Sequence, residues 1–212
     1  LPCCPGMRKV PKRTMTKPSE LTINPKDGLK EMADISTSGT LVVFSHGKES
    51  GPMGAKIRAL AGVAERLGAS TLSVNYREHP NGTLHDQDAP GEAERRVAQL
   101  LATPLPPHQS LVLVGSSMGG YVSTVASQHL AVHKLFLLAP AFYLPGYAEQ
   151  QPTPRADSTL VIHGWQDDVV PVTHSMRFAQ QHRCALHLLD GDHRLNDVLD
   201  AITSQFQLFL QT

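Results

Sequence analysis

From about residue 40 onward, short apolar runs alternate with longer amphipathic segments, and this alternation limits the possible folds more than any other feature. The apolar runs are continuous, as in strands that are buried on both faces. The segments between them repeat their apolar residues at helical spacing. Strands that alternate with helices predict an α/β fold, with a mostly parallel central sheet and helices on both faces. The predicted strands are 41–44, 70–76, 111–114, 134–139, 159–163 and 185–189, and the predicted helices are 55–67, 92–101, 121–130, 173–182 and 196–210.

The length of the chain is that of one domain. The 212 residues are 41% hydrophobic and 18% charged, which is typical of a globular protein. We expect a single domain over residues 21–212, in which 21–23 supplies a further edge strand. Residues 1–20 are basic and rich in proline and lack the apolar region of a secretory signal. We expect a flexible or expression-derived leader there; a transit peptide, or a natural start at Met7 or Met15, is the alternative.

The charge balance and the cysteines restrict the partners. The 19 basic and 19 acidic residues cancel, so no basic surplus attracts nucleic acid or an anionic membrane. No apolar run reaches the roughly 18 residues of a membrane-spanning helix. The three cysteines, Cys3, Cys4 and Cys184, are too few and too scattered for a disulfide framework. We expect a cytoplasmic protein with no nucleic-acid or membrane partner, no metal and no organic cofactor; its oligomeric state is left open.

A G-x-S-x-G motif follows the strand predicted over 111–114 and precedes a helix. It occupies residues 115–119, and its central residue is Ser117. This strand–turn–helix context is the one in which the motif forms a nucleophile elbow. The turn is so sharp that its centre is strained and the flanking residues must be small. We therefore predict Ser117 as a nucleophile above a helix N-terminus that can stabilise an oxyanion, with a plain glycine and serine turn as the alternative.

A carboxylate and a histidine follow two later strands. Asp167 and Asp168 come after the strand predicted over 159–163. The H-G-x-x-D-x-x-V-P spacing favours Asp167, and Asp168 is the lesser candidate. Among eleven histidines, His193 is the one that follows the last predicted strand. The order serine, aspartate, histidine along the chain is the one that a catalytic triad on such a sheet requires, and a histidine suits proton transfer near neutral pH.

Taken together, these motifs give residues 40–212 a resemblance to compact, lidless α/β-hydrolases of the dienelactone hydrolase and small carboxylesterase branch. The resemblance implies the α/β-hydrolase fold without a large cap domain. It also assigns the oxyanion hole. In such enzymes the residue after an H-G pair supplies one backbone N–H, which here is Lys48, and the residue after the nucleophile supplies the other, Met118. His46 then organises the loop and is not a second base.

The expected function is hydrolysis of a carboxylic ester through an acyl-enzyme, with a small-molecule acyl compound as substrate. Two alternatives stay open: a thioesterase or peptidase that uses the same triad, and a binding protein that keeps the fold without catalysis. The expected pocket walls are the loops that follow the strands. Their candidate residues are Tyr76, Arg77, Phe142, Tyr143, Tyr147 and Trp165, and for any one of the aromatic residues packing in the core or at the rim is the favoured alternative.

Overall fold

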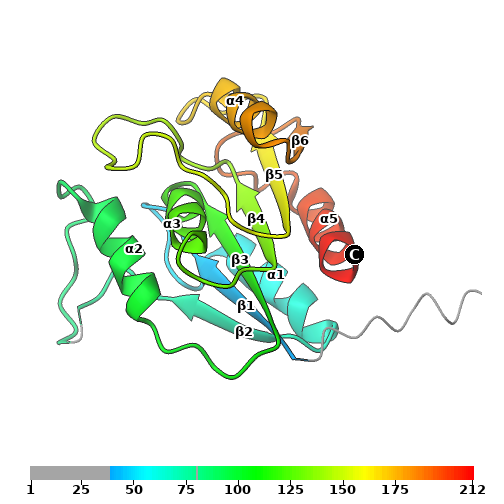
Figure 1. Ribbon diagram of the computed structural model, residues 1–212. Helices are drawn as coiled ribbons and strands as arrows, with labels where there is room; N and C mark the ends of the chain where they lie inside the picture. Colours follow the sequence, from blue (N-terminus) through cyan, green and yellow to red (C-terminus); the bar gives the residue numbers. More distant parts are fainter. Residues whose placement is uncertain (1–38, 80) are drawn as a thin grey trace, which may run out of the picture. The chain divides into compact units, whose positions relative to one another are not determined.

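The computed structural model describes residues 39–79 and 81–212 of the chain. Within them, six parallel strands form one sheet in the order β2-β1-β3-β4-β5-β6 (Figure 1). The predicted leader over 1–20 and the predicted edge strand over 21–23 lie outside the described residues. The strands are β1 (Thr40–Ser45), β2 (Ser70–Val74), β3 (Ser110–Ser116), β4 (Lys134–Leu138), β5 (Ser158–Gly164) and β6 (Ala185–Leu189). The helices are α1 (Ala55–Arg66), α2 (Glu92–Ala102), α3 (Met118–Ser127), α4 (Val172–His182) and α5 (Leu199–Gln211).

Both faces of the sheet are covered by helices, as the continuous apolar strands predict. Leu41 and Val43 of β1 belong to a core that includes side chains of α2, α3 and α4. Val42 and Phe44, which point to the other face, belong to a core with α1 and α5. Successive side chains of a strand point to opposite faces, so one apolar run serves two cores. The predicted class, α/β with helices on both faces, is confirmed.

The strand order reverses between β1 and β3, and this position locates the site. The chain leaves β1 for β2 on one side and later returns to β3 on the other side of β1. Ser45 and Gly115, near the carboxyl ends of these two strands, are register partners. Ligands of open α/β sheets bind outside the carboxyl ends of the strands at such a reversal. The loops that follow β1 and β3 are therefore neighbours in space.

Helix α3 begins three residues earlier than predicted, at Met118 instead of 121. The two glycines of its first turn weakened the prediction, because glycine disfavours helix interiors. A tertiary contact requires one of them. A Cβ built on Gly119 would lie 2.0 Å from the backbone oxygen of Ser45, so only glycine lets α3 approach β1 this closely.

The connection from β4 to β5 contains no helix, and no large cap domain covers the carboxyl end of the sheet in the described residues. Residues 196–198, predicted as the first turn of the last helix, instead form a turn before α5. Among the helices of residues 39–79 and 81–212, none has the length and hydropathy needed to cross a membrane.

Candidate active site

Ser117 occupies a strained turn between β3 and α3. Its backbone angles are φ 54° and ψ −121°, a region that residues other than glycine rarely adopt. The turn is held by the Ser117 N–H, which donates to the Leu138 carbonyl at 2.9 Å, and by the Ser117 carbonyl, which accepts from Ala141 N–H at 3.0 Å. The turn also requires Gly115, whose added Cβ would lie 2.3 Å from the Gly119 oxygen. This is the backbone geometry of a nucleophile elbow.

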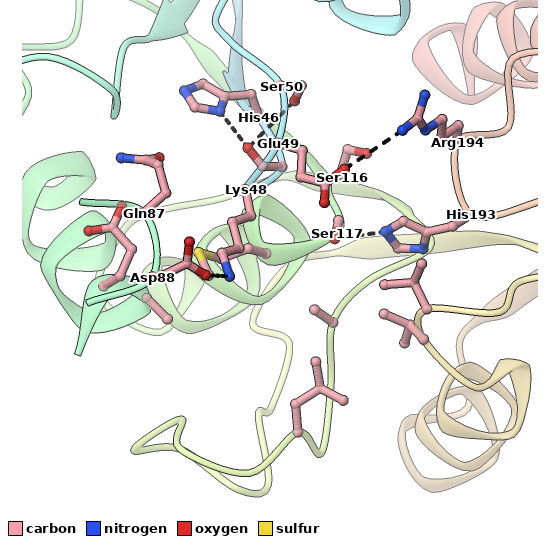
Figure 2. A pocket seen from close by; sticks show the side chains of 18 of the residues that line it. His46, Lys48, Glu49, Ser50, Gln87, Asp88, Ser116, Ser117, His193 and Arg194 are labelled. Carbon is pink, nitrogen blue, oxygen red and sulfur yellow. Dashed lines mark hydrogen bonds and ion pairs between the residues drawn. The ribbon is translucent and has the colours of Figure 1, made fainter. Parts of the chain in front are cut away.

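Ser117, His193 and Asp167 form one hydrogen-bonded chain, although they come from three different loops. His193 Nε2 lies 3.0 Å from Ser117 Oγ, and His193 Nδ1 lies 2.7 Å from Asp167 Oδ2. Because Nδ1 faces a carboxylate, it carries the proton, and Nε2 is left to accept from the serine hydroxyl. Figure 2 shows the His193 ring directed at Ser117.

The carboxylate of Asp167 is fully buried and accepts hydrogen bonds on both oxygens. Oδ1 accepts the N–H groups of Val169 and Val170, at 2.9 and 2.7 Å. Oδ2 contacts His193 and also His163, whose Nε2 lies 2.9 Å away. Burial alone raises the pKa of this carboxyl, but hydrogen bonds from the two histidines and two backbone N–H groups outweigh it and hold the pKa well below its usual range. Asp167 is therefore ionised at neutral pH.

His163 is the residue that sequence reasoning missed. It is the histidine of the H-G-x-x-D spacing and lies at the end of β5. In the structure its ring is fully buried, with Nε2 between Asp167 Oδ2 and the Val170 carbonyl and Nδ1 2.7 Å from Ser175 Oγ. Since Nε2 faces two acceptors, it must carry a proton. The sequence signal for its role is the H-G-x-x-D spacing between His163 and Asp167, but spacing alone does not predict that the two side chains are in contact.

Asp168, the lesser candidate, is not brought to His193. It is exposed and lies in the wall of the cavity next to Ser117. The turn after β5 directs neighbouring side chains to different sides, so that Asp167 points inward to the histidines.

The loop after β1 lies against the elbow. A Cβ on Gly47 would be 3.3 Å from Ser117 Cβ, so the Gly47 backbone is packed beside Ser117. Lys48 follows, and it lines the cavity together with Met118, the first residue of α3. The Lys48 ammonium forms an ion pair with Asp88 (Figure 2). The two predicted oxyanion donors thus lie on the two segments that flank Ser117.

His46 uses both of its ring nitrogens within this loop. Nδ1 donates to the Gly47 carbonyl at 2.7 Å, and Nε2 accepts the Tyr76 N–H at 3.2 Å. Burial is the main cause that lowers the pKa of His46 to about 4, so the ring is neutral near pH 7. Its position organises the loop, as the resemblance implies, and leaves no nitrogen free to act as a base.

Comparison with known proteins gives two decisive matches. The model of the family described as "Uncharacterised protein family (UPF0227)" matches residues 41–151, more than half of the chain. A crystal structure from Xanthomonas campestris pv. campestris, described as a hydrolase of the alpha/beta superfamily, is 30% identical with a TM-score of 0.68. The match covers 82% of this chain and 98% of that one. The chain is a member of the UPF0227 family and of the α/β-hydrolase superfamily.

More distant structures share the fold of this α/β-hydrolase. A serine hydrolase without lid from Xanthomonas campestris is 22% identical with a TM-score of 0.66, and the match covers 84% of each chain. Est1E from Butyrivibrio proteoclasticus, in a structure with ferulic acid bound, is 18% identical with a TM-score of 0.68, over 83% of this chain and 90% of that one. Among curated proteins, none matches the chain. These matches show the shared fold.

A cavity of about 1040 Å³ opens beside Ser117 and His193 in this α/β-hydrolase. Part of its wall is apolar and comes from the loop after β4, with Leu144, Pro145 and Tyr147. Charged side chains of the loop after β1 and of the first turn of α1 form another part. Tyr147 was a predicted wall residue and does line the cavity.

The prediction is wrong for the other five candidate wall residues, which do not line this cavity. Tyr76 and Phe142 are fully buried in the core on the α2 and α3 side of the sheet. Arg77 does not line the cavity, although it donates to the carbonyl of the lining residue Ser50 at 3.3 Å. Tyr143 packs under the guanidinium of Arg177, 4.0 Å from its ring centroid, and Trp165 is 55% exposed. That ligands bind at the carboxyl ends of the strands predicts the correct edge of the sheet, but it does not predict which side chains of a loop turn toward the cavity.

In the described part of the chain, no group of three or more histidine, cysteine, aspartate or glutamate side chains has the arrangement of a metal site. Two ion pairs join charged side chains of the cavity wall, Lys48 with Asp88 and Glu49 with Arg194. Glu49 and Arg194 approach to 3.8 Å across the rim of the cavity (Figure 2).

Proposed function

We propose that this protein is a serine hydrolase that cleaves a carboxylic ester, with Ser117 as nucleophile, His193 as general base and acid, and Asp167 as the orienting carboxylate. One observation carries the proposal: the chain of hydrogen bonds from Ser117 Oγ through His193 to the buried Asp167, which starts at a strained elbow. A degenerate fold that only binds a ligand has no need to retain this strain or to bury an ionised carboxylate.

In the proposed reaction, Ser117 Oγ attacks the acyl carbonyl while His193 Nε2 takes the hydroxyl proton. The carbonyl oxygen becomes an oxyanion, and Asp167 stabilises the imidazolium that forms. His193 then donates the proton to the leaving alkoxide as the carbon–oxygen bond breaks. A water molecule repeats the sequence on the acyl-enzyme, releasing the acid and restoring Ser117.

The N–H groups of Met118 and Lys48 are the proposed donors to the oxyanion. Met118 supports this role because it is the first residue of α3, where backbone N–H groups have no carbonyl partner within the helix. Lys48 supports it because its peptide with Gly47 is packed beside Ser117. Each such donor typically contributes about 3 kcal/mol to stabilisation of the transition state.

Reaction with a fluorophosphonate probe tests the nucleophile. We expect covalent labelling, mapped to Ser117 by mass spectrometry, that is lost in S117A and retained in S116A, the adjacent serine. The hydrolysis of activated esters should fall in parallel by at least about 1000-fold in S117A. Full activity in a folded S117A would reject the assignment.

A panel of matched substrates separates the ester reading from its alternatives. An ester, a thioester and an amide of the same short acyl group should be compared by kcat/KM with the wild-type protein. We expect the ester and thioester to react and the ester to be preferred. A preference for the thioester or the amide would move the assignment to a thioesterase or a peptidase with the same triad.

A further inference from the structure

Arg96 of α2 is a fully buried arginine whose guanidinium reaches the loop beside the nucleophile. Nη1 donates to the carbonyl of His46 at 3.1 Å and to the carbonyl of Gly47 at 3.3 Å. Nε donates to Glu92, one helical turn earlier, at 2.7 Å. The remaining nitrogen donates to Gln87. Each branch of the guanidinium therefore has an acceptor, as a buried charge requires.

The ionised partner of Arg96 is itself held in place. Burial raises the pKa of Glu92, but hydrogen bonds from Arg95 and Arg96 outweigh this effect and lower it. Arg95 donates to both Glu92 oxygens, at 2.6 and 2.8 Å, and also to the Tyr76 carbonyl at 2.8 Å. The two arginines thus share one carboxylate, but only Arg96 continues to the loop after β1.

The carbonyl that Arg96 contacts belongs to the peptide of the proposed oxyanion donor. The Gly47 carbonyl and the Lys48 N–H are parts of one planar peptide group, in which they point in opposite directions. Besides Arg96, this carbonyl accepts His46 Nδ1 at 2.7 Å and, in a longer contact, Ser50 Oγ at 3.5 Å. Figure 2 shows His46 and Ser50 on this loop above Ser117. Donors on the carbonyl fix the direction of the N–H and also polarise it.

We propose that Arg96 is a positioning residue: with His46, its guanidinium holds the Gly47 carbonyl so that the Lys48 N–H faces the oxyanion that forms on Ser117. The inference rests on the proposed function. Gly47 is packed against Ser117, so a rotation of the peptide that joins Gly47 to Lys48 would turn the N–H away from the nucleophile. Arg96 therefore acts on the oxyanion through the peptide that it holds.

The hydrogen bonds also explain why an arginine, and not an apolar residue, occupies position 96 of α2. Burying a guanidinium is costly, and a well-packed apolar side chain would serve stability as well. An apolar side chain could not donate to two carbonyls at once, whereas the arginine fork reaches both from a rigid helix.

The test compares an oxygen ester with its thionoester, in which sulfur replaces the carbonyl oxygen. Sulfur is a weak hydrogen-bond acceptor, so a damaged oxyanion hole slows the oxygen ester more than the thionoester. We expect R96M to lower kcat on the oxygen ester by roughly 10 to 100-fold with KM changed by less than about threefold, and to lower the oxygen-to-sulfur rate ratio by about tenfold. For R96K, which keeps the charge but loses the forked guanidinium, both kcat on the oxygen ester and the rate ratio should lie between the values for R96M and wild type.

A second measurement uses an alkyl trifluoromethyl ketone, which forms a hemiketal oxyanion on Ser117. Its inhibition constant should rise in R96M by the factor by which kcat/KM falls. The matched control is R95M, which removes the neighbouring arginine and its contact with Glu92 but no bond to the loop after β1. We expect R95M to leave the rate ratio and the inhibition constant within about twofold of wild type.

The outcomes separate this inference from the function on which it rests. If the wild-type protein hydrolyses no ester and is not labelled by the fluorophosphonate, the proposed function and the role of Arg96 are both rejected. If wild type is active and folded R96M or R96K lowers both rates equally with an unchanged ratio, Arg96 is only structural and the inference alone is overturned. If R96M does not fold, R96K decides by the same ratio.

Discussion

His163 Nε2 lies 2.9 Å from Asp167 Oδ2, the same carboxylate oxygen that His193 Nδ1 contacts at 2.7 Å. One oxygen of this buried aspartate is thus in contact with the imidazole rings of two histidines. Asp167 cannot rotate toward either ring without losing the other, which holds its carboxylate in one orientation. His163 is therefore the support that keeps the acceptor of His193 in place.

The first prediction concerns this support. H163L should lower the free energy of unfolding by about 1–3 kcal/mol, because it leaves part of a buried carboxylate and the Ser175 hydroxyl without a partner. Its kcat should fall by about tenfold or less, since three other donors still hold Asp167. Urea denaturation and ester kinetics measure the two effects, and S175A, which removes only the outer contact, should cost about 1 kcal/mol. Unchanged stability in H163L would contradict this view.

The second prediction distinguishes the two adjacent aspartates. D167N should lower kcat by about three to four orders of magnitude, because an amide at this position favours the wrong tautomer of His193. D168N should change kcat by less than about threefold, since Asp168 is exposed and does not contact His193. Steady-state hydrolysis of an activated ester compares the two variants, and the reverse ranking would exclude Asp167 as the orienting group.

A third prediction follows from the lowered pKa of Asp167. A carboxyl with a folded pKa below its unfolded value of about 3.9 contributes stability above that value and loses it as the pH falls through the folded pKa. The difference in unfolding free energy between wild type and D167N should therefore be constant above about pH 5 and shrink as the pH falls below about 4. Denaturant titrations from pH 7 to pH 3 measure this difference. A difference that grows in acid would have the wrong sign.

The fourth prediction tests the close approach of α3 to β1. G119A should lose about 3 kcal/mol of stability or more, because its methyl group would lie 2.0 Å from a backbone oxygen that no side-chain rotation can move. The control is G62A in α1, where a Cβ would meet nothing closer than the Arg66 side chain at 3.5 Å. There alanine should stabilise the helix by about 0.5–1 kcal/mol. Thermal unfolding compares the variants, and equal melting temperatures for both would refute the packing argument.

A fifth prediction concerns Lys56, which lies in the cavity wall. Burial lowers the pKa of its ammonium to about 8, although Asp192 and Asp167 raise it in part. A lysine whose folded pKa is below its unfolded value of about 10.4 destabilises the folded state when protonated, and the penalty fades as the pH rises from 8 to 10.4. K56M should therefore be more stable than wild type at pH 7 by on the order of 1–3 kcal/mol, with less advantage at pH 10.

The control for Lys56 is the more exposed Lys48, which has an ion pair with Asp88. K48M should change stability by less than about 1 kcal/mol, because exposed ion pairs contribute little. Chemical denaturation at pH 7 and pH 10 measures both variants. A loss of stability in K56M at pH 7 would show that the ammonium has a compensating partner.

Much of the fold was predictable because it depends on local patterns. Each apolar run buried on both faces indicates a strand, and the spacing between runs indicates the helices and the parallel sheet. The predicted start of α3 is too late, since the glycines that weaken helix propensity serve contacts with other segments: Gly119 with Ser45 of β1 and Gly120 with Pro140. Local propensity does not register a contact of that kind.

The sequence by itself determined the sheet and the residues at its carboxyl edge. In a parallel sheet those ends share one edge, so Ser117, Asp167 and His193 are neighbours whatever the details of the loops. Only the tertiary structure decided which side chains turn inward from that edge. It decided that His163 supports Asp167 and that Arg96, from a helix with no motif, holds the loop beside Ser117. Such contacts join residues far apart in the chain, and their direction depends on packing between elements, which no local pattern encodes.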